Sequence, residues 1–591
     1  MARAAPRMDP PEIRPQPKGK LALLSGLLRW GRENADRLVA VLAALGFALS
    51  YGFDYGQDNQ LVYLLRSLTI ANPGILENDW FASQTTHYHP VFAYFGALLL
   101  WMDPEGWAIA LVHIAIVTAG MVMVYEMLRA LGPRRAAVAA FFCTLAVVLK
   151  TRTSSVATSY VFDSLLQPSA IGSLGLLAGA AEFVRGRYLA SGIWLGVGGL
   201  FHANYLVLAV PVFGLAQLLI GFPGLVARGI RQLGPLALAA LPLLPVMLAT
   251  ASSPDAERAQ QILFEIRSPH HYNPGNFRGQ LVPFAAYQVF GIALAAHLLR
   301  GRRTAAGRFG ILLAALMAVV WVGTAFQTIE YVPRAAQIFV YRLAPYIDLF
   351  CVAIACFVLV ELAITPSTVR RLAPAAVALA AGGLVVLGTF ADDRRNPFSL
   401  LFTFSVAALG ICALALLGEG LARAKLGFVG RFWRRRGAWV VVAGATLTLA
   451  GLPDVLAKTR ERSSLLRDRE PNPMLAWMRE HTAADAVFLS PPDLDWIRYH
   501  GQRAIVVDWK GAPMVPGELV EWQRRLSDVT GREVRSRRDL RGYNELDQRR
   551  LRMLTAKYRL NYVIVRREAV RKLGFERIPA YEDDRFVVYR L

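Results

Sequence analysis

The sequence predicts a mainly α-helical, polytopic membrane protein with about thirteen transmembrane helices and a small C-terminal α/β domain. Of its 591 residues, 55% are hydrophobic and only 18% are charged, and the mean hydropathy is +0.36. Apolar runs of about 18 residues or more recur along the chain, and a helix of this length crosses a bilayer. Short arginine-rich loops separate the runs, which is typical of cytoplasmic loops. We therefore attribute the net charge of +22 to membrane topology and not to nucleic-acid binding.

The N-terminal tail, residues 1–36, is basic and contains several prolines. Its apolar run Leu21–Leu28 is too short for the hydrophobic region of a signal peptide followed by a cleavage site. We expect the tail to stay in the cytoplasm and the first span, 37–53, to act as an uncleaved anchor. The cysteines all lie in apolar runs, which argues against a disulfide framework and a cysteine-based zinc site; they are Cys143, Cys351, Cys356 and Cys412.

An outer loop, 54–105, follows the first span. It contains a short apolar segment, 91–102. If this segment crossed the membrane, the next run, 106–131, would end with Arg134 and Arg135 outside, although basic loops tend to stay in the cytoplasm. We therefore expect 91–102 to lie along the interface or to re-enter, and 106–131 to cross inward.

The later spans then place the strongly basic short loops consistently in the cytoplasm. The mixed-charge segment 391–396 is the weak point, because it falls outside. A second long outer loop covers 251–281, and the whole transmembrane domain covers 37–457. The spans expected after 106–131 are 136–150, 168–184, 188–203, 205–221, 233–250, 282–299, 308–326, 336–362, 372–390, 397–418 and 437–456.

Residues 458–591 form the expected soluble domain, on the same non-cytoplasmic side as the outer loops. Stretches with helical periodicity, such as 472–482, alternate with short β-branched runs, such as 561–567 and 585–591. This alternation predicts a small αβα sandwich. The domain contains no GxGxxG, P-loop or GxSxG motif.

Four segments together resemble a known family. Asp54 and Asp58 open the outer loop, HYHPVF stands at 87–92, EMLRALGPRRAAV at 126–138, and PMLAWMREHTAADAVFLSPP at 473–492. This arrangement is similar to the GT-C class of membrane glycosyltransferases, in particular protein O-mannosyltransferases and oligosaccharyltransferase catalytic subunits. HYHPVF departs from the mannosyltransferase motif in having Tyr88 and a single proline. SPPDLDW stands where oligosaccharyltransferases carry Trp-Trp-Asp, so transfer to asparagine sequons is not supported.

The resemblance implies a sugar donor linked to polyprenyl phosphate and a catalytic carboxylate in the outer loop. The candidates are Asp54, Asp58 and Asp79, and Asp54 is the first choice as the general base. One base can suffice because phosphate is a good leaving group. The alternative is that these acids cap helices or pair with Arg66.

Histidines and arginines near the outer face are candidates for substrate binding. Arg342 lies inside an apolar run, where a charge is costly unless it is paired or faces a cavity. It could hold a lipid phosphate bidentately, or it could snorkel or pair with Asp348. The full set is His87, His89, His202 with Asn204, Arg267, His270, His271, Arg334 and Arg342, with Lys150, Arg152 and Asp163 as weaker candidates.

Each histidine group has a second interpretation. His202 and Asn204 either face the active cavity or bond a neighbouring helix end. His87 and His89 could bind the donor phosphate, hold a metal with Asp79, or pack where the segment at Pro90 begins. The motif PHHYNP (269–274) is either a rigid substrate-contacting patch or a turn built by proline and asparagine. We assign no metal site, and the sequence leaves the need for a divalent cofactor open.

Tryptophans adjoin charged residues at two places in the C-terminal domain. Such pairs are common at carbohydrate sites, but we favour a core or docking role for these tryptophans. The residues are Asp508, Trp509, Lys510, Glu521 and Trp522.

The expected function is sugar transfer from a polyprenyl-phosphate-linked donor to a glycan, lipid or protein acceptor on the non-cytoplasmic face. The abundance of arginine and alanine indicates a bacterial source, hence the inner membrane. The alternatives are a transporter or flippase, and a non-catalytic scaffold for envelope assembly. Transporters usually show repeats and midplane charges, whereas the polar candidates here gather at the outer face.

Overall fold

The computed structural model describes residues 34–86, 89–151, 155–298, 303–329, 338–364, 473–574 and 577–591. The predicted spans 372–390, 397–418 and 437–456 lie outside these residues, as do His87, Arg152 and Arg334. The description below concerns the described residues alone.

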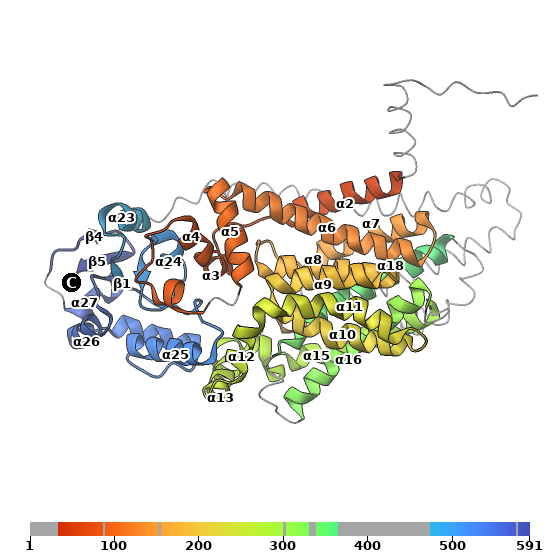
Figure 1. Cartoon of the computed structure of the whole chain (residues 1–591). Coiled ribbons are helices and arrows are strands. Elements are labelled where there is room, and N and C mark those ends of the chain that lie inside the picture. The colour runs from red at the N-terminus through yellow and green to blue at the C-terminus, as the bar shows by residue number, and fades with distance from the viewer. Residues whose placement is uncertain are drawn as a thin grey trace, which may run out of the picture.

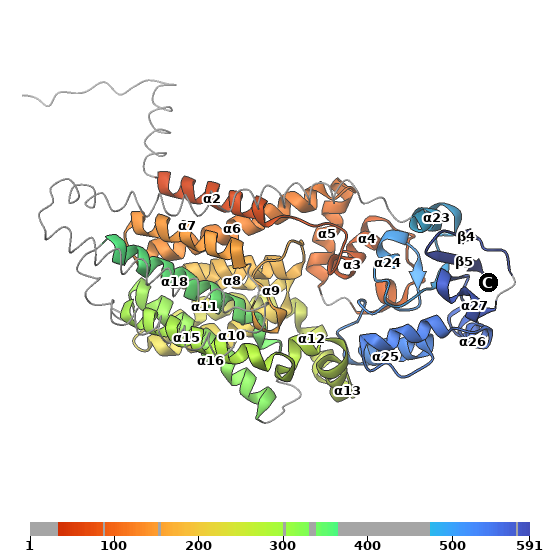
Figure 2. The same cartoon turned by 180° about the vertical axis from the view of Figure 1, so that it is seen from behind.

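Long apolar helices run side by side along the length of the molecule, and the C-terminal domain caps one end (Figure 1). By length and composition, four described helices could each cross a membrane: Trp107–Leu131, Ala203–Ile220, Ala305–Thr328 and Val340–Val358. The long helices of this part are α2 (Ala35–Tyr51), α6 (Trp107–Leu131), α7 (Arg134–Thr151), α8 (Pro168–Val184), α9 (Tyr188–Phe201), α10 (Ala203–Ile220), α11 (Leu225–Ala240), α15 (Arg278–Leu298), α16 (Ala305–Thr328) and α18 (Ala344–Ile364). Figure 2 shows α7 and α18 side by side from behind.

The helix expected at 233–250 differs from the prediction. Helix α11 begins earlier, at Leu225, and ends at Ala240, and a 3₁₀ turn (Leu241–Leu243) then leads into α12 (Leu244–Ala251). Pro242 and Pro245 each lack a backbone N–H, which explains the break. The outer segment after α12 contains α13 (Ala256–Gln261), the π-helix η4 (Ile262–Arg267), α14 (Pro269–Tyr272) and η5 (Pro274–Phe277).

The outer loop folds into short helices that end in α5 (Pro90–Met102). These are α3 (Gln60–Tyr63), α4 (Leu65–Ala71) and the π-helix η1 (Trp80–Gln84). Helix α5 runs across the bundle (Figure 1), an orientation that favours the interface for this segment. Its outward face is apolar and exposed, at Tyr94, Leu98, Trp101 and Met102, and tryptophan and tyrosine are typical of membrane interfaces.

Helices α4 and α5 cross at very close range. A Cβ atom on Gly96 of α5 would collide with the Ser67 hydroxyl of α4. Glycine is therefore required at this crossing, and the two helices form one packed unit beneath the C-terminal domain.

The C-terminal domain is built on a five-stranded sheet of order β2-β1-β3-β5-β4. Strand β1 (Val487–Leu489) pairs in parallel with β2 (Ala504–Ile505) and with β3 (Tyr562–Arg566). Strand β5 (Phe586–Arg590) pairs antiparallel with β3 and with β4 (Tyr581–Glu582). Helices α23 (Pro473–His481), α24 (Ile497–Gly501), α25 (Pro516–Thr530) and α26 (Gln548–Tyr558) surround this sheet.

Alternate strand residues pack into two separate cores. Val563 and Val587 join the core that contains Trp522, whereas Ile564 and Val588 join the core that contains Met474. Because successive side chains of a strand point to opposite faces, the two cores lie on the two faces of the sheet. This is the αβα arrangement that the sequence predicts.

The end of the bundle away from the C-terminal domain is held by ion pairs. Glu126 of α6 pairs with Arg185 and with Arg37, whose Nε lies 2.9 Å from Oε1. Asp36 of α2 pairs with Arg129 at 3.2 Å. These pairs tie α2, α6 and the end of α8 together at the side where the sequence predicts cytoplasmic basic loops.

Candidate functional site

Asp54 follows α2 and is tied to the segment just before α8. Its backbone N–H donates to the Ser164 carbonyl at 2.7 Å, and its Oδ2 accepts the Ser164 hydroxyl at 2.5 Å. The residue forms an isolated parallel bridge with Leu165. Its carboxylate remains partly exposed. Asp54 is thus a fixed, partly exposed acceptor near the end of the bundle that the C-terminal domain caps.

The segment 155–167 links Asp54 to the interior. Gln60 donates through Nε2 to the Leu166 carbonyl at 3.1 Å. The Tyr160 hydroxyl accepts from Gln167 at 2.8 Å and, more weakly, from Asn59 at 3.4 Å. The start of the outer loop and this segment therefore form one hydrogen-bonded layer.

Arg342 lies at the start of α18, in the 3₁₀ turn Val340–Leu343. Its guanidinium carbon is 4.9 Å from the centre of the Phe339 ring and 6.0 Å from that of Tyr205. Its Nε is buried without a hydrogen-bond partner, and no carboxylate of the described residues pairs with it. Asp348, the partner considered from the sequence, instead accepts the Ser155 hydroxyl. Arg342 is therefore a half-buried cation with no acidic partner in the described part of the chain.

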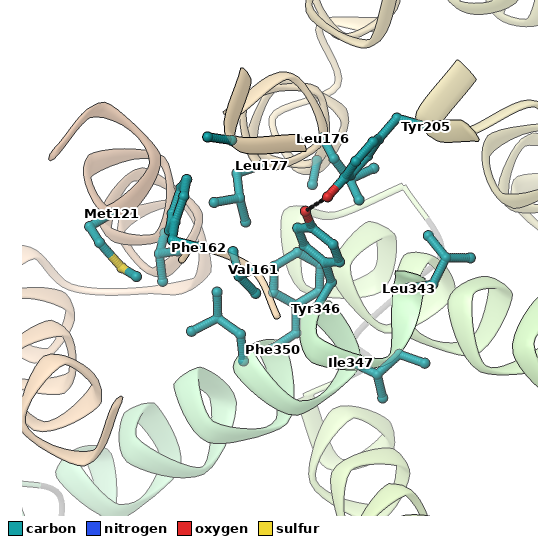
Figure 3. Close-up of a cluster of buried hydrophobic side chains, with 14 of the residues drawn as sticks. Met121, Val161, Phe162, Leu176, Leu177, Tyr205, Leu343, Tyr346, Ile347 and Phe350 are labelled. Atoms are coloured by element: carbon teal, nitrogen blue, oxygen red, sulfur yellow. Dashed lines mark hydrogen bonds between the residues drawn. The ribbon is translucent and has the colours of Figure 1, made fainter. Parts of the chain in front are cut away.

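Aromatic and histidine rings form a continuous layer around Arg342. Tyr205 stands next to His202, with ring centres 5.3 Å apart, and His202 lies 4.6 Å from His89. Behind this layer, the Tyr205 and Tyr346 hydroxyls meet at 2.9 Å in the apolar core (Figure 3). The structure thus brings together the predicted residues His89, His202 and Arg342.

His271 reaches the same region from the second outer loop. Its ring centre is 5.2 Å from that of Phe339, and its Nδ1 lies 2.7 Å from the Ala157 carbonyl. Burial, followed by neighbouring positive charge, lowers the pKa of both His89 and His271 to about 3. Both rings are therefore neutral at physiological pH, and Arg342 supplies the positive charge of the cluster.

The other two predicted carboxylates lie elsewhere. Asp58 is exposed and forms an ion pair with Lys510 of the C-terminal domain. Asp79 is fully buried; it caps η1 through the Ala82 N–H at 2.8 Å and accepts from Arg498 Nε at 2.9 Å. The three carboxylates do not converge on one site.

Arg267 and His270 lie at the edge of the cluster. Arg267 Nη2 lies 3.4 Å from the Lys510 carbonyl, and its guanidinium stands 5.7 Å from the centre of the Trp509 ring. His270 is exposed beside His271. Arg267 therefore contacts the C-terminal domain. Trp509 and Trp522 are buried in the core of that domain.

The C-terminal domain forms hydrogen bonds with the outer loop through residues that the sequence did not single out. His500 Nε2 lies 2.7 Å from the Gly56 carbonyl, two residues after Asp54. Glu518 accepts from the Thr86 N–H and hydroxyl at 2.7 and 2.8 Å. No motif marks His500 or Glu518, because each contact joins positions more than 400 residues apart.

A pocket opens in the outer loop next to the cluster. Its lining combines apolar side chains with two threonines, a tyrosine, an arginine and a histidine. The lining residues are Val62, Tyr63, Leu65, Arg66, Phe81, Ala82, Thr85, Thr86, His89 and Ala93. His89 belongs to both the pocket and the ring layer around Arg342. Among the described residues, no group of three His, Cys, Asp or Glu side chains could hold a metal ion.

Comparison with protein families gives two matches. Residues 87–249 match the family described as dolichyl-phosphate-mannose-protein mannosyltransferase. The chain resembles membrane glycosyltransferases of the GT-C class. Residues 470–529 match a domain of unknown function, DUF6798. No curated protein gives a significant match.

Solved GT-C structures are similar over most of the chain. ArnT from Cupriavidus metallidurans, bound to undecaprenyl phosphate, is 15% identical, with a TM-score of 0.49, over 95% of this chain and 98% of that one. The Archaeoglobus fulgidus oligosaccharyltransferase in its apo form is 14% identical, with a TM-score of 0.48, over 90% of this chain and 69% of that one. The same enzyme, AglB, with an inhibitory peptide and dolichol-phosphate is 13% identical, with a TM-score of 0.47, over 91% and 70%.

Proposed function

We propose that this chain transfers a sugar from a polyprenyl-phosphate-linked donor to an envelope acceptor on the non-cytoplasmic side of the membrane. In a bacterium this membrane would be the inner membrane. The observation that carries the proposal is Arg342, a half-buried arginine whose Nε is enclosed and which has no acidic partner among the described residues. Withdrawing a charge from water without a partner is costly, so such a residue is best explained by an anionic ligand. The family match over 87–249 supports a lipid-phosphate donor.

Arg342 would bind the phosphate of the donor. Guanidinium donates two parallel hydrogen bonds to phosphate oxygens, and these bonds strengthen where water is excluded. The rings of His89 and His271 are neutral, so Arg342 is the positive charge that faces the phosphate. Negative charge that develops on the departing phosphate is thus offset at one place.

Asp54 would act as the base. The acceptor hydroxyl oxygen forms a bond to the anomeric carbon as the bond from that carbon to the phosphate oxygen breaks. The polyprenyl phosphate leaves with the bonding electron pair, and the hydroxyl proton passes to Asp54. Direct attack of this kind inverts the anomeric configuration. Ser164 holds the carboxylate by its hydrogen bond, and Asp58 is the second candidate for the base.

Asp79 is assigned a structural role in this proposal, because its carboxylate is enclosed by donors of the protein. His202, Arg267, His270 and His271 are assigned to the walls of the substrate site.

The test compares envelope glycans and glycolipids by mass spectrometry in cells that lack the protein and in complemented cells. Wild type and Glu77→Gln, a control at an exposed carboxylate of the same loop, should restore the missing sugar. Asp54→Asn and Arg342→Gln should not restore the sugar at equal protein levels. Removing a general base such as Asp54 lowers rates about 10²–10⁴-fold, and removing Arg342 takes away the cation that binds the donor phosphate. Restoration by Asp54→Asn would exclude this base. Unchanged glycans after deletion would favour transport or a scaffold role.

A further inference from the structure

The outer-loop pocket combines a cation with apolar and hydroxyl-bearing side chains. Arg66 of α4 lines it together with Thr85 and Thr86, and the apolar lining includes Leu65 and Phe81. The lining comes from α3, α4, η1 and the first turn of α5. A pocket of this composition fits a ligand that has an anionic group on an apolar or hydroxylated body.

Arg66 has no acidic partner in the part of the chain that the structure describes. Its guanidinium makes one long contact, from Nη1 to the Thr69 hydroxyl at 3.5 Å. The outer-loop acids considered as its partners are engaged elsewhere: Asp58 with Lys510, and Asp79 with Arg498. The arginine is partly buried, so its charge is available to a ligand in the pocket.

The pocket and the Arg342 cluster share a wall. His89 lines the pocket and lies 4.6 Å from His202, and Tyr63 of the pocket lies 5.4 Å from His89. His89 therefore links the pocket that Arg66 lines to the ring layer around Arg342. The proposed donor phosphate binds at Arg342, which leaves the pocket at Arg66 for the second substrate.

The C-terminal domain contacts residues that line or adjoin this pocket. Glu518 holds Thr86 of the pocket lining, and Arg525 stacks at 4.4 Å from the ring centre of Trp80, next to Phe81. Glu518 thus fixes Thr86, and the Thr85 hydroxyl donates to the Phe81 carbonyl at 2.6 Å. Both threonines of the pocket are therefore held in place.

We propose that the outer-loop pocket binds the acceptor substrate through an anionic group, a phosphate or a carboxylate, held by Arg66. The identification of the ligand as the acceptor substrate rests on the proposed function. The anion-binding property itself does not depend on it, because it follows from an arginine without an acidic partner among the described residues and from the composition of the lining.

The test measures binding of three probes to the full-length purified protein by isothermal titration calorimetry. Phenyl phosphate supplies an anion on an apolar ring, phenyl β-glucoside is its uncharged counterpart, and undecaprenyl phosphate probes the donor site. Arg66→Gln should weaken phenyl phosphate binding about tenfold, the effect of losing a charge-assisted hydrogen bond, and should change undecaprenyl phosphate binding less than about twofold. Arg342→Gln should show the reverse pattern.

The controls separate the two arginines from general effects. Arg135→Gln, at an exposed arginine of α7, should bind both phosphates as wild type does, and Arg66→Lys should retain part of the phenyl phosphate affinity. Equal weakening of undecaprenyl phosphate by Arg66→Gln and Arg342→Gln would overturn the inference, because the pocket would then serve the donor. Equal affinity of wild type for phenyl phosphate and phenyl β-glucoside would also overturn it. Failure of wild type to bind undecaprenyl phosphate would instead count against the proposed donor.

Discussion

Replacing Arg498 with methionine should destabilise the interface between the outer loop and the C-terminal domain. Arg498 is 2% exposed and bridges two carboxylates, Asp79 and Asp508, which are 0% and 2% exposed. Methionine fills a similar volume but leaves both carboxylates without their cation. Removing one partner of a buried pair costs about 3–5 kcal/mol.

Part of the charge on each carboxylate stays compensated by backbone donors. The Ile505 N–H lies 3.0 Å from Asp79 Oδ2, and the Gly511 N–H donates to Asp508. We therefore expect the lower half of the range, about 3–4 kcal/mol. Asp79→Asn alone should cost less, because Arg498 then keeps its contact with Asp508.

Hydrogen exchange of the full-length protein, read by mass spectrometry at β2, β3 and the η1 segment, gives the free energy of local opening. Arg535→Met is the matched control, because Arg535 pairs with Glu533 on the surface and exposed ion pairs contribute little to stability. The triple variant Arg498→Met, Asp79→Asn, Asp508→Asn should recover part of the loss. If Arg498→Met opens no more readily than Arg535→Met, the buried bridge does not stabilise this interface.

Three further predictions concern packing, positioning and pH. Gly96→Ala should destabilise the α4–α5 unit by about 1–3 kcal/mol through overpacking. The control Gly46→Ala, at a site with open space around it, should be neutral or slightly stabilising. Thermal unfolding compares the two variants, and equal effects would contradict the close crossing. His500→Ala should lower the turnover number of sugar transfer more than it changes donor affinity, because it frees the Gly56 carbonyl near the proposed base, and His500→Gln should restore part of the rate; an unchanged rate for His500→Ala would exclude this positioning role. Burial and a neighbouring carboxylate raise the pKa of Asp495 to about 7, so the folded state holds a proton that the unfolded state loses above about pH 4. The stability of the C-terminal domain should therefore fall as the pH rises from about 4 to 7. Asp495→Asn should flatten that part of the pH profile of unfolding.

The sequence predicted helix positions well where polar residues flank an apolar run. Helix α8 spans Pro168–Val184, as expected, because Pro168 suits the first turn and Arg185 ends the run. The break between α11 and α12 was not anticipated, although Pro242 and Pro245 mark it. The start of α11 at Leu225 was also missed, since the first turns carry Arg228 and Arg231 and hydropathy alone excluded them.

The site was predictable only in part. Arg342 stood out because a charge within an apolar run needs an explanation, and His89 and His202 stood out as polar residues at helix starts. The engagement of Asp79 with Arg498 could not be inferred, since an isolated sequence does not show which distant residue supplies the cation. Ser164 and Tyr160 lay in a loop without a recognisable motif, and their importance follows only from their hydrogen bonds to Asp54 and Asn59.

The bridge between Asp79 and Arg498 has a consequence for biosynthesis. The two residues are 419 positions apart, so Asp79 leaves the ribosome long before its partner is made. Throughout that interval the carboxylate stays hydrated, and the outer loop cannot adopt its final closed form. Closure is therefore a late step, which follows translation of the C-terminal domain. A nascent chain that stops short of residue 498 would display an unfinished loop at the membrane surface, which quality-control proteases could recognise.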